Sequence, residues 1–249
     1  MTEPPPLLLD VYHRFYERYG PQGWWPGEGA FETIVGAILT QNTSWSNVEK
    51  ALAVMKEARV WSFPALRKTP EPELAQLVRS SGYFNAKAKK LKAMAAYMAG
   101  YEDEVAHWRT RDSKELRSEL LAVHGVGPET ADDIVLYVAH LPSFVIDTYT
   151  RRIVNRLGLE PERATYEGYQ DLFEANLPAE AALFNEYHAL LDAHAKETCL
   201  KREPRCRGCC LLDLCPTGLR ASVSGAVDEP RGSHEEMPNA GPRFSARRA

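Results

Sequence analysis

Along most of the chain, apolar residues recur every three or four positions, a spacing that places them on one face of an α-helix. Two helix starts are also marked by local chemistry. Asp112 followed by Glu115 is a capping pair, and Gly127-Pro128 puts a proline at a first helical position. No segment shows the strict alternation of a β-strand. The pattern predicts an all-α fold with helices near residues 7–18, 31–38, 48–55, 74–78, 88–98, 112–123, 128–138, 147–157, 166–175 and 181–196.

The composition agrees with a globular protein that builds its own core. The 249 residues are 44% hydrophobic and 26% charged, and a chain of this length buries roughly 70–75% of its unfolded surface. No run of 18 apolar residues is present, so we predict no membrane-spanning helix. The first nine residues have no cationic start and no long apolar stretch, so we expect no signal peptide and a cytoplasmic protein.

The net charge of −4 does not by itself indicate a nucleic-acid binder, but the charge is unevenly distributed. Residues 199–220 carry five basic and two acidic side chains, a local charge of +3. A second basic patch consists of Lys87, Lys89, Lys90 and Lys92. Each patch is either an ordinary solvated surface or a phosphate-binding one, and composition leaves both open.

Five cysteines lie within 17 residues, and none occurs elsewhere. Four of them, separated by six, two and five residues, are Cys199, Cys206, Cys209 and Cys215, and Cys210 is additional. Because the number is odd and the expected compartment is reducing, disulfides are a poor explanation, and the thiolates are predicted to bind a metal. Zinc and a [4Fe–4S] cluster both accept four sulfur ligands, so the residues alone leave these two open.

A metal in this loop would hold three arginines on a rigid support. Arg202, Arg205 and Arg207 lie among the cysteines, and we predict that they contact DNA phosphates there. The segment after the last cysteine is different. Residues 216–249 contain four glycines, four prolines, four serines and one aromatic residue, a composition that predicts a disordered extension.

A glycine-containing turn joins two predicted helices within residues 120–131, the hairpin. Gly125 and Gly127 allow backbone conformations that other residues avoid, and they let another molecule approach closely. The N–H groups of such a turn, beside a helix N-terminus, suit a phosphate. Twenty residues after Gly127, Asp147 follows three apolar residues. From the residues alone, Asp147 is either a helix cap or a carboxylate at the edge of a pocket.

Five motifs occur in order between about residues 31 and 215: Leu39-Thr40-Gln41-Asn42-Thr43, Gly82-Tyr83-Phe84-Asn85-Ala86-Lys87-Ala88, Gly125-Val126-Gly127-Pro128-Glu129-Thr130-Ala131, Val145-Ile146-Asp147-Thr148 and the cysteine cluster. Together they resemble the endonuclease III family of DNA glycosylases, in the helix-hairpin-helix superfamily. The resemblance implies two all-α lobes with damaged double-stranded DNA bound in the cleft between them. It also implies a [4Fe–4S] cluster on the four spaced cysteines, with Cys210 outside the pattern. We expect a monomer with no membrane partner.

The resemblance also divides the chain. Residues 1–23 would form an N-terminal helix packed with the cluster lobe, and residues 24–140 a six-helix barrel that contains the hairpin. Residues 141–215 would supply the C-terminal helices and the cluster loop, followed by the disordered tail at 216–249.

Individual positions take roles from the same resemblance. Such enzymes flip the damaged nucleotide out of the duplex, and Gln41 matches the residue that fills the vacated space, although a helix-capping amide is the plainer interpretation. The hairpin turn, which consists of His124, Gly125, Val126 and Gly127, would contact the DNA backbone. Asp147 matches the aspartate that stabilises the cationic sugar and orients the attacking water. Asp132 and Asp133, on the second hairpin helix, are expected to face solvent.

The family's position for a Schiff-base lysine holds Glu129 here. A carboxylate cannot form an imine, so we predict a monofunctional glycosylase that leaves the abasic site uncut. A lysine from elsewhere in the chain is the alternative. Two further readings stay open: an endonuclease III-like glycosylase and lyase for oxidised pyrimidines, and a DNA-binding module without catalysis.

Aromatic residues indicate which kind of damaged base the protein binds. Trp24, Trp25 and Pro26 precede the first barrel helix, and Trp45 follows the Gln41 motif. In isolation these would be packing residues, but the chain is similar to the 3-methyladenine branch of the family, where aromatics at these places form the base pocket. Electron-rich rings attract a cationic base such as N3-alkylated adenine, by roughly 0.5–2 kcal/mol per contact. An alkylated purine is therefore the expected substrate.

Overall fold

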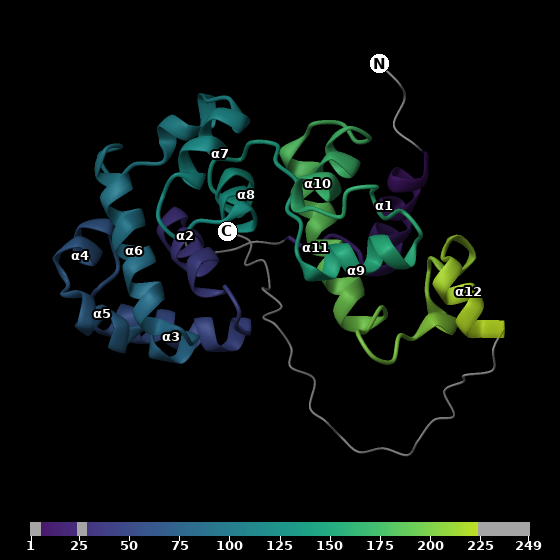
Figure 1. Ribbon diagram of the computed structural model, residues 1–249, viewed down its shortest axis with the longest axis horizontal. Helices are drawn as coiled ribbons and strands as arrows, with labels where there is room; N and C mark the ends of the chain where they lie inside the picture. Colours follow the sequence, from purple (N-terminus) through teal and green to yellow (C-terminus); the bar gives the residue numbers. More distant parts are fainter. Residues whose placement is uncertain (1–5, 24–28, 224–249) are drawn as a thin grey trace, which may run out of the picture.

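The computed structural model describes residues 6–23 and 29–223, and every regular element within them is helical. The predicted all-α fold is confirmed. The α-helices are α1 (Pro6–Tyr19), α2 (Ala30–Leu39), α3 (Trp45–Glu57), α4 (Phe63–Lys68), α5 (Glu71–Leu77), α6 (Phe84–Ala99), α7 (Ser113–Leu121), α8 (Pro128–Tyr137), α9 (Thr148–Arg156), α10 (Tyr166–Glu174), α11 (Ala181–Glu197) and α12 (Pro216–Val223) (Figure 1). None of the helices in the described ranges is both long and apolar enough to cross a membrane.

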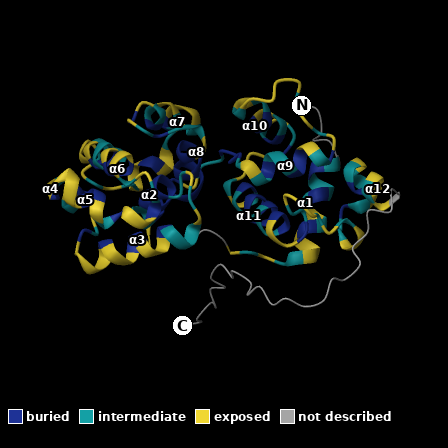
Figure 2. Cartoon of the chain, turned by 60° about the horizontal axis from the view of Figure 1, so that its bottom comes forward, coloured by how far each residue is buried: buried dark blue, intermediate teal, exposed yellow. Residues whose placement is uncertain are grey.

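Buried apolar side chains form two clusters, one in each of two lobes that lie side by side (Figures 1 and 2). The first cluster lies among α2 to α8, and Trp108 is its largest fully buried side chain. The second lies among α1, α9, α10 and α11, where the rings of Phe144 and Phe173 stack with centroids 3.9 Å apart. The first helix of the chain thus packs against α11, far away in the sequence.

Helix α8 belongs to both lobes. Ala131, Ile134 and Val135 enter the first core, whereas Leu136 and Tyr137 enter the second. All residues from 130 to 137 are buried, including two aspartates. The expectation that Asp132 and Asp133 face solvent is wrong, because a helix enclosed by two lobes has no solvent side over this stretch.

Local capping signals in the sequence are realised. The Asp112 carboxylate accepts hydrogen bonds from the backbone N–H of Lys114 (2.9 Å) and of Glu115 (3.0 Å) at the start of α7. Pro128 occupies the first turn of α8, directly after Gly127. The Asp112 contacts satisfy N–H groups that have no partner inside the helix, and Pro128 has no N–H that would need one.

Two helices differ from the sequence-based expectation. Helix α4 is only six residues long, too short for a repeat to be visible, and it is held by the burial of Phe63 and Leu66. Helix α12 begins at Pro216, inside the segment expected to be disordered, so that expectation is wrong for residues 216–223. It packs against α9 and the cysteine loop, and such local anchoring is invisible in an average composition. Residues 224–249 of the predicted tail lie outside the described residues.

Candidate active site and nucleic-acid interface

Asp147 lies at the junction of the two lobes, at the start of α9. The three preceding residues, 144–146, are at most 1% exposed and fix the approach of the chain. The Asp147 Oδ1 accepts a hydrogen bond from the Thr150 backbone N–H at 2.7 Å, so it caps α9 as one of the two interpretations proposed. Its side chain is nevertheless 20% exposed. A single carboxylate can thus serve as a cap through one oxygen and present the other to a ligand.

Two helices bring further titratable groups to Asp147. On α8, Glu129, Asp133 and Tyr137 are spaced four residues apart and therefore share one face. From α11, the His188 Nε2 lies 3.9 Å from the Asp147 Oδ2. The other ring nitrogen of His188, Nδ1, lies 2.5 Å from the Tyr137 hydroxyl. The sequence analysis did not single out His188 or Tyr137, because residues 137, 147 and 188 meet only through tertiary packing.

Two acids on α8 near Asp147 have raised pKa values. Burial raises the pKa of Asp133 well above its usual range, and repulsion by Glu129, Asp132 and Asp147 adds to this shift. The pKa of Glu129 rises to about 7, first because surrounding protein displaces water and then through repulsion by Asp147, against the opposing charge of Arg151. Glu129 is nevertheless exposed, at the first turn of α8. The region around Asp147 thus combines several acidic groups whose titration their surroundings change.

The Gln41 motif meets the hairpin. The Gln41 amide Nε2 donates to the Gly125 carbonyl oxygen at 3.2 Å and to the Thr130 hydroxyl at 2.9 Å. Its Oε1 accepts from the Lys90 ammonium at 2.5 Å. Within the described residues the Gln41 side chain does not cap its own helix, because its three hydrogen-bond partners lie on other elements. The structure brings two separate motifs into one surface next to the hairpin turn.

The two hairpin glycines have different reasons to be glycine. Gly125 has φ +84°, in the left-handed region, and a side chain there would collide with the aliphatic part of Lys90. Gly127 has φ −95°, which any residue can adopt, and open space where a Cβ would stand. His124 is exposed and Val126 is buried. The open side of Gly127 is compatible with close approach of another molecule, such as a DNA backbone.

The lysine patch at 87–92 is not one surface. Lys87 is 1% exposed, and its ammonium donates to the carbonyls of Leu39 (2.8 Å) and Ser81 (2.5 Å). Lys92 donates to the carbonyl of Arg67 at 2.8 Å, and Lys89 is exposed. Lys87 therefore belongs to the interior, whereas for Lys89 and Lys90 the solvated and the phosphate-binding interpretation both stay open.

The aromatic residues proposed for base binding are only partly described. Trp45 begins α3, is half-buried and packs against the first core, so a packing role accounts for part of its surface. Trp24, Trp25 and Pro26 lie outside the described residues. Their predicted role in a base pocket stays a prediction.

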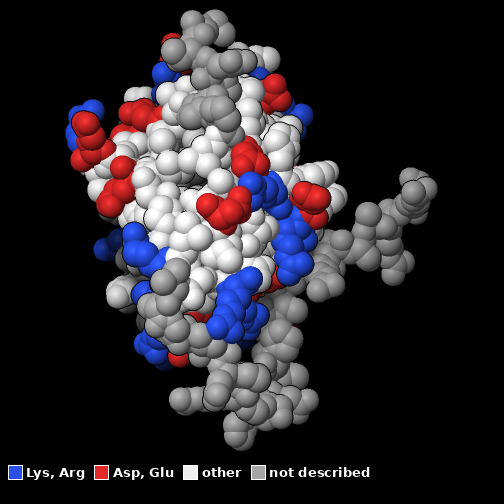
Figure 3. All heavy atoms as spheres, turned by 90° about the vertical axis from the view of Figure 1, so that its right-hand side faces the viewer, with Lys and Arg blue, Asp and Glu red and all other residues white. Residues whose placement is uncertain are grey.

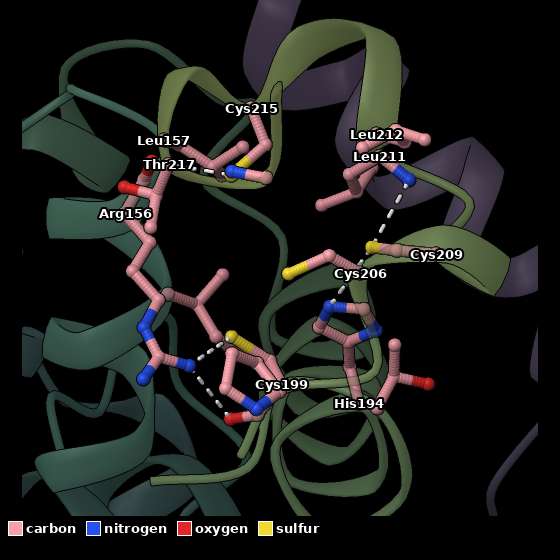
Figure 4. A pocket seen from close by; sticks show the side chains of 14 residues that line it. Arg156, Leu157, His194, Cys199, Cys206, Cys209, Leu211, Leu212, Cys215 and Thr217 are labelled. Carbon is pink, nitrogen blue, oxygen red and sulfur yellow. Dashed lines mark hydrogen bonds between the residues drawn. The ribbon is translucent and has the colours of Figure 1, made fainter. Parts of the chain in front are cut away.

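The four spaced cysteines surround one pocket in the second lobe. Figure 4 shows their side chains directed into it from several sides, with Cys215 above and Cys199 below in the view. The other lining is largely apolar, with Ile153, Leu157 and Leu211. Cys210 is not part of the lining, and its carbonyl instead accepts from the Arg14 guanidinium at 3.1 Å.

The donor set of the pocket consists of four thiols within a largely apolar lining. A [4Fe–4S] cluster uses such a donor set, and zinc also accepts four sulfur ligands. No group of three His, Cys, Asp or Glu side chains within the described ranges is arranged to hold one metal ion.

The arginines near this loop fall into two groups. Arg152 and Arg156 turn inward, where Arg156 donates to the Cys199 Sγ at 3.1 Å and Arg152 to the Cys199 carbonyl at 3.0 Å. Arg202, Arg205 and Arg207, which were predicted to contact DNA, are exposed. Figure 3 views the molecule from the end that carries α12 and shows basic side chains gathered in the lower half of this face. The described part of the loop thus leaves these three side chains available to a polyanion.

Comparisons with known proteins give a consistent result. Residues 35–179 match the family described as the HhH-GPD superfamily base excision DNA repair protein. Over 212 residues the chain is 40% identical to a candidate DNA repair glycosylase of Methanocaldococcus jannaschii, covering 84% of this chain and 96% of the relative.

Two solved structures are similar in fold. One is endonuclease III trapped as a covalent intermediate with DNA, with a TM-score of 0.75 and 22% identity, covering 87% of this chain and 98% of that one. The other is the 3-methyladenine DNA glycosylase of H. pylori bound to 1,N6-ethenoadenine, with a TM-score of 0.65 and 25% identity. It covers 76% of this chain and 96% of the glycosylase.

Proposed function

Because the chain belongs to the HhH-GPD superfamily of base excision DNA repair proteins, we propose that this DNA glycosylase is monofunctional and hydrolyses the glycosidic bond of alkylated purines. The observation that carries the proposal is the setting of Asp147. Its Oδ1 is fixed by the Thr150 N–H at 2.7 Å, and its side chain keeps an exposed fifth at the junction of the lobes. A fixed, accessible carboxylate is what a hydrolytic mechanism through a cationic sugar requires.

In the proposed reaction, the damaged nucleotide leaves the duplex and its sugar comes to lie against Asp147. As the bond between base and sugar breaks, positive charge develops on the sugar, and the Asp147 carboxylate stabilises it. The same carboxylate orients a water molecule toward C1′.

Strand cleavage would need an amine at the sugar. In the enzymes that this chain resembles, a lysine supplies this amine. Here Glu129, on the first turn of α8, stands at that position. A carboxylate cannot form an imine with the sugar. This supports hydrolysis by water, with the abasic site left intact.

The substrate class follows from charge and aromatic surface. N3-alkylated adenine is cationic and already has a weakened glycosidic bond, so it gains more than a normal purine from stacking on Trp24, Trp25 and Trp45. Similarity to a 3-methyladenine DNA glycosylase supports the same class. Gln41 would fill the space that the base vacates, while the turn at 124–127 contacts the DNA backbone.

Cys199, Cys206, Cys209 and Cys215 would hold a [4Fe–4S] cluster. Such a cluster would fix the loop that carries Arg202, Arg205 and Arg207 and so present three cations to DNA phosphates. Purified protein should be brown, with absorbance near 400 nm that disappears when the four cysteines are replaced by serine. Colourless protein that contains zinc would overturn this part of the proposal.

The function is tested by excision from a panel of duplexes that carry single lesions. We expect release of 3-methyladenine, with the DNA strand intact until the abasic site is cleaved by alkali. Normal purine duplexes serve as the control. The absence of 3-methyladenine release at any enzyme excess would defeat the substrate assignment.

A second candidate is a bifunctional glycosylase and lyase for oxidised pyrimidines. It is favoured by the similarity to endonuclease III trapped covalently with DNA and by the Lys90 amine, which lies against Gln41 beside the hairpin. Borohydride trapping on a thymine-glycol duplex separates the two candidates. A covalent adduct that is lost in Lys90→Met, but not in Lys89→Met, would support the second candidate and contradict the first.

A further inference from the structure

The surroundings of Asp147 include a buried imidazole to which the proposed reaction assigns no part. His188 on α11 is 4% exposed, and its Nε2 lies 3.9 Å from the Asp147 Oδ2. Its Nδ1 lies 2.5 Å from the hydroxyl of Tyr137 on α8. Three elements that are distant in sequence thus place a phenol, an imidazole and a carboxylate in one chain of contacts.

The protonation of the groups around His188 bears on which ring nitrogen carries its proton. Burial raises the pKa of Tyr137 well above its usual range, and Asp133, Asp147 and Asp192 add to this, so the phenol keeps its proton. Burial lowers the pKa of His188 itself, although Asp147 and Asp192 oppose the shift while Lys196 adds to it. A neutral ring that accepts the phenol's hydrogen bond at Nδ1 carries its own proton on Nε2. Nε2 is the atom that faces Asp147.

We propose that His188, supported by Tyr137, is a positioning residue that donates from Nε2–H to the Asp147 Oδ2 during catalysis; this rests on the proposed glycosylase function. The Thr150 N–H already holds Oδ1 at 2.7 Å, so a second donor on Oδ2 would fix the carboxylate in one orientation. The present 3.9 Å is longer than a hydrogen bond. Such catalytic contacts are often long in free enzymes and shorten when substrate binds.

The helix cap of Asp147 and the proposed contact with His188 use different oxygens of the carboxylate. The N-terminus of α9 is capped through Oδ1, without any help from His188. A buried polar ring costs folding free energy unless its nitrogens are used. Asp192 and Lys196, which form an ion pair at 2.8 Å, follow His188 at four-residue intervals along α11. They place charge beside the ring, where it can influence the contact between His188 and Asp147.

The test compares two substitutions of His188. Phenylalanine fills the space without a donor, whereas the Nε2 of glutamine can still donate to Asp147. We expect His188→Phe to lower the single-turnover rate of 3-methyladenine release by about tenfold or more. We also expect the acid limb of its pH–rate profile to move to higher pH, because a carboxylate without its donor is protonated more easily. His188→Gln should restore most of the rate and the position of the limb.

Controls keep the result interpretable. The exposed His13→Gln should leave rate and pH profile unchanged, and DNA affinity should be equal in all variants. Circular dichroism and thermal melting identify a variant that has not folded. If His188→Phe does not fold, Tyr137→Phe, which removes only the hydroxyl, takes its place and should shift the same limb. Wild-type rate and profile in the folded variant would overturn the proposal.

A second measurement does not depend on the substrate. Nitrogen-15 spectra of the imidazoles distinguish the two neutral tautomers, and the His188 signal is the one missing in His188→Gln. We expect a proton on Nε2 in the wild type and a changed tautomer balance in Tyr137→Phe. A proton on Nδ1 in the wild type overturns the proposal. If the wild type releases no 3-methyladenine while the proton is on Nε2, the substrate assignment fails and the positioning of Asp147 stands.

Discussion

Two neighbouring buried aspartates, Asp132 and Asp133, lie on different sides of α8 and have opposite surroundings. On one side, Asp132 is fully buried. Its carboxylate accepts two hydrogen bonds from the Arg117 guanidinium, at 2.8 and 3.1 Å, and one from the Ser143 hydroxyl at 2.5 Å. On the other side, Asp133 is 5% exposed, and no basic side chain of the described residues forms an ion pair with it. Burial and neighbouring acids raise its pKa well above the usual range.

This difference between the two sides of α8 distinguishes a carboxylate that supports the fold from carboxylates that lie near the proposed chemistry. Through Arg117 and Ser143, the buried Asp132 links α7, α8 and the segment before α9. On the other side of α8, burial and neighbouring acids raise the pKa values of Asp133 and Glu129. Perturbed titrations of this kind gather at functional sites. The side of α8 that carries Glu129 and Asp133 is therefore where we place the chemistry.

The largest expected effect concerns Asp147, which lies next to the Glu129 and Asp133 side of α8. Asp147→Asn keeps a good helix cap for α9 but removes the negative charge, so base release should fall by roughly 10²–10⁴-fold. DNA binding and thermal stability should stay near wild type. Single-turnover excision assays measure the loss, with the exposed Asp171→Asn as the matched control. Undiminished release by Asp147→Asn would remove Asp147 from the mechanism.

Substitution on the Asp132 side of α8 should lower the stability of the folded protein. Asp132→Asn leaves the largely buried Arg117 without its partner, which should lower the free energy of unfolding by about 3–5 kcal/mol. Urea unfolding followed by circular dichroism measures this loss. Glu115→Gln breaks an exposed pair with Arg111, at 3.9 Å, and should change stability by less than about 1 kcal/mol. Equal effects of the two substitutions would contradict the assignment of Asp132 as a structural charge.

A smaller effect is expected at Glu129. Since its pKa is raised to about 7, the side chain gains its charge between pH 6 and 8, and this charge adds to the field that stabilises a cationic sugar. The single-turnover rate of the wild type should rise by about threefold over this range beyond the contribution of other groups. Glu129→Gln should not show this rise. Parallel pH profiles of variant and wild type would show that Glu129 does not act on the reaction.

The smallest effect concerns the pH dependence of stability. The raised pKa of Asp133 means that the folded state keeps a proton which the unfolded chain loses, so stability falls as pH rises above the unfolded value. Asp133→Asn removes this penalty. Its melting temperature should exceed that of the wild type by about 2 °C or more at pH 8 and match it near pH 4. Calorimetry at both pH values checks the prediction, and a gain independent of pH would contradict it.

Several features of the site were predictable because they are local. The Asp112 cap and the Pro128 helix start depend on neighbours a few residues away, and both occur as predicted. The spacing of four cysteines predicted a common site, and the structure places these thiols around one pocket. Helix α12 was missed because its short sequence has no strong repeat and its stability comes from contacts with α9 and the cysteine loop.

The sequence by itself determined the helices, the all-α class and the candidates for chemistry, since these depend on periodicity, capping and motif spacing. Only the tertiary structure decided which side chains meet: Gln41 with Lys90 and Gly125, and Asp147 with His188. It also decided that two neighbouring aspartates of α8 have opposite surroundings. The physical reason is that burial and the field of distant charges arise when lobes pack together, and neither is encoded in the spacing of residues along one helix.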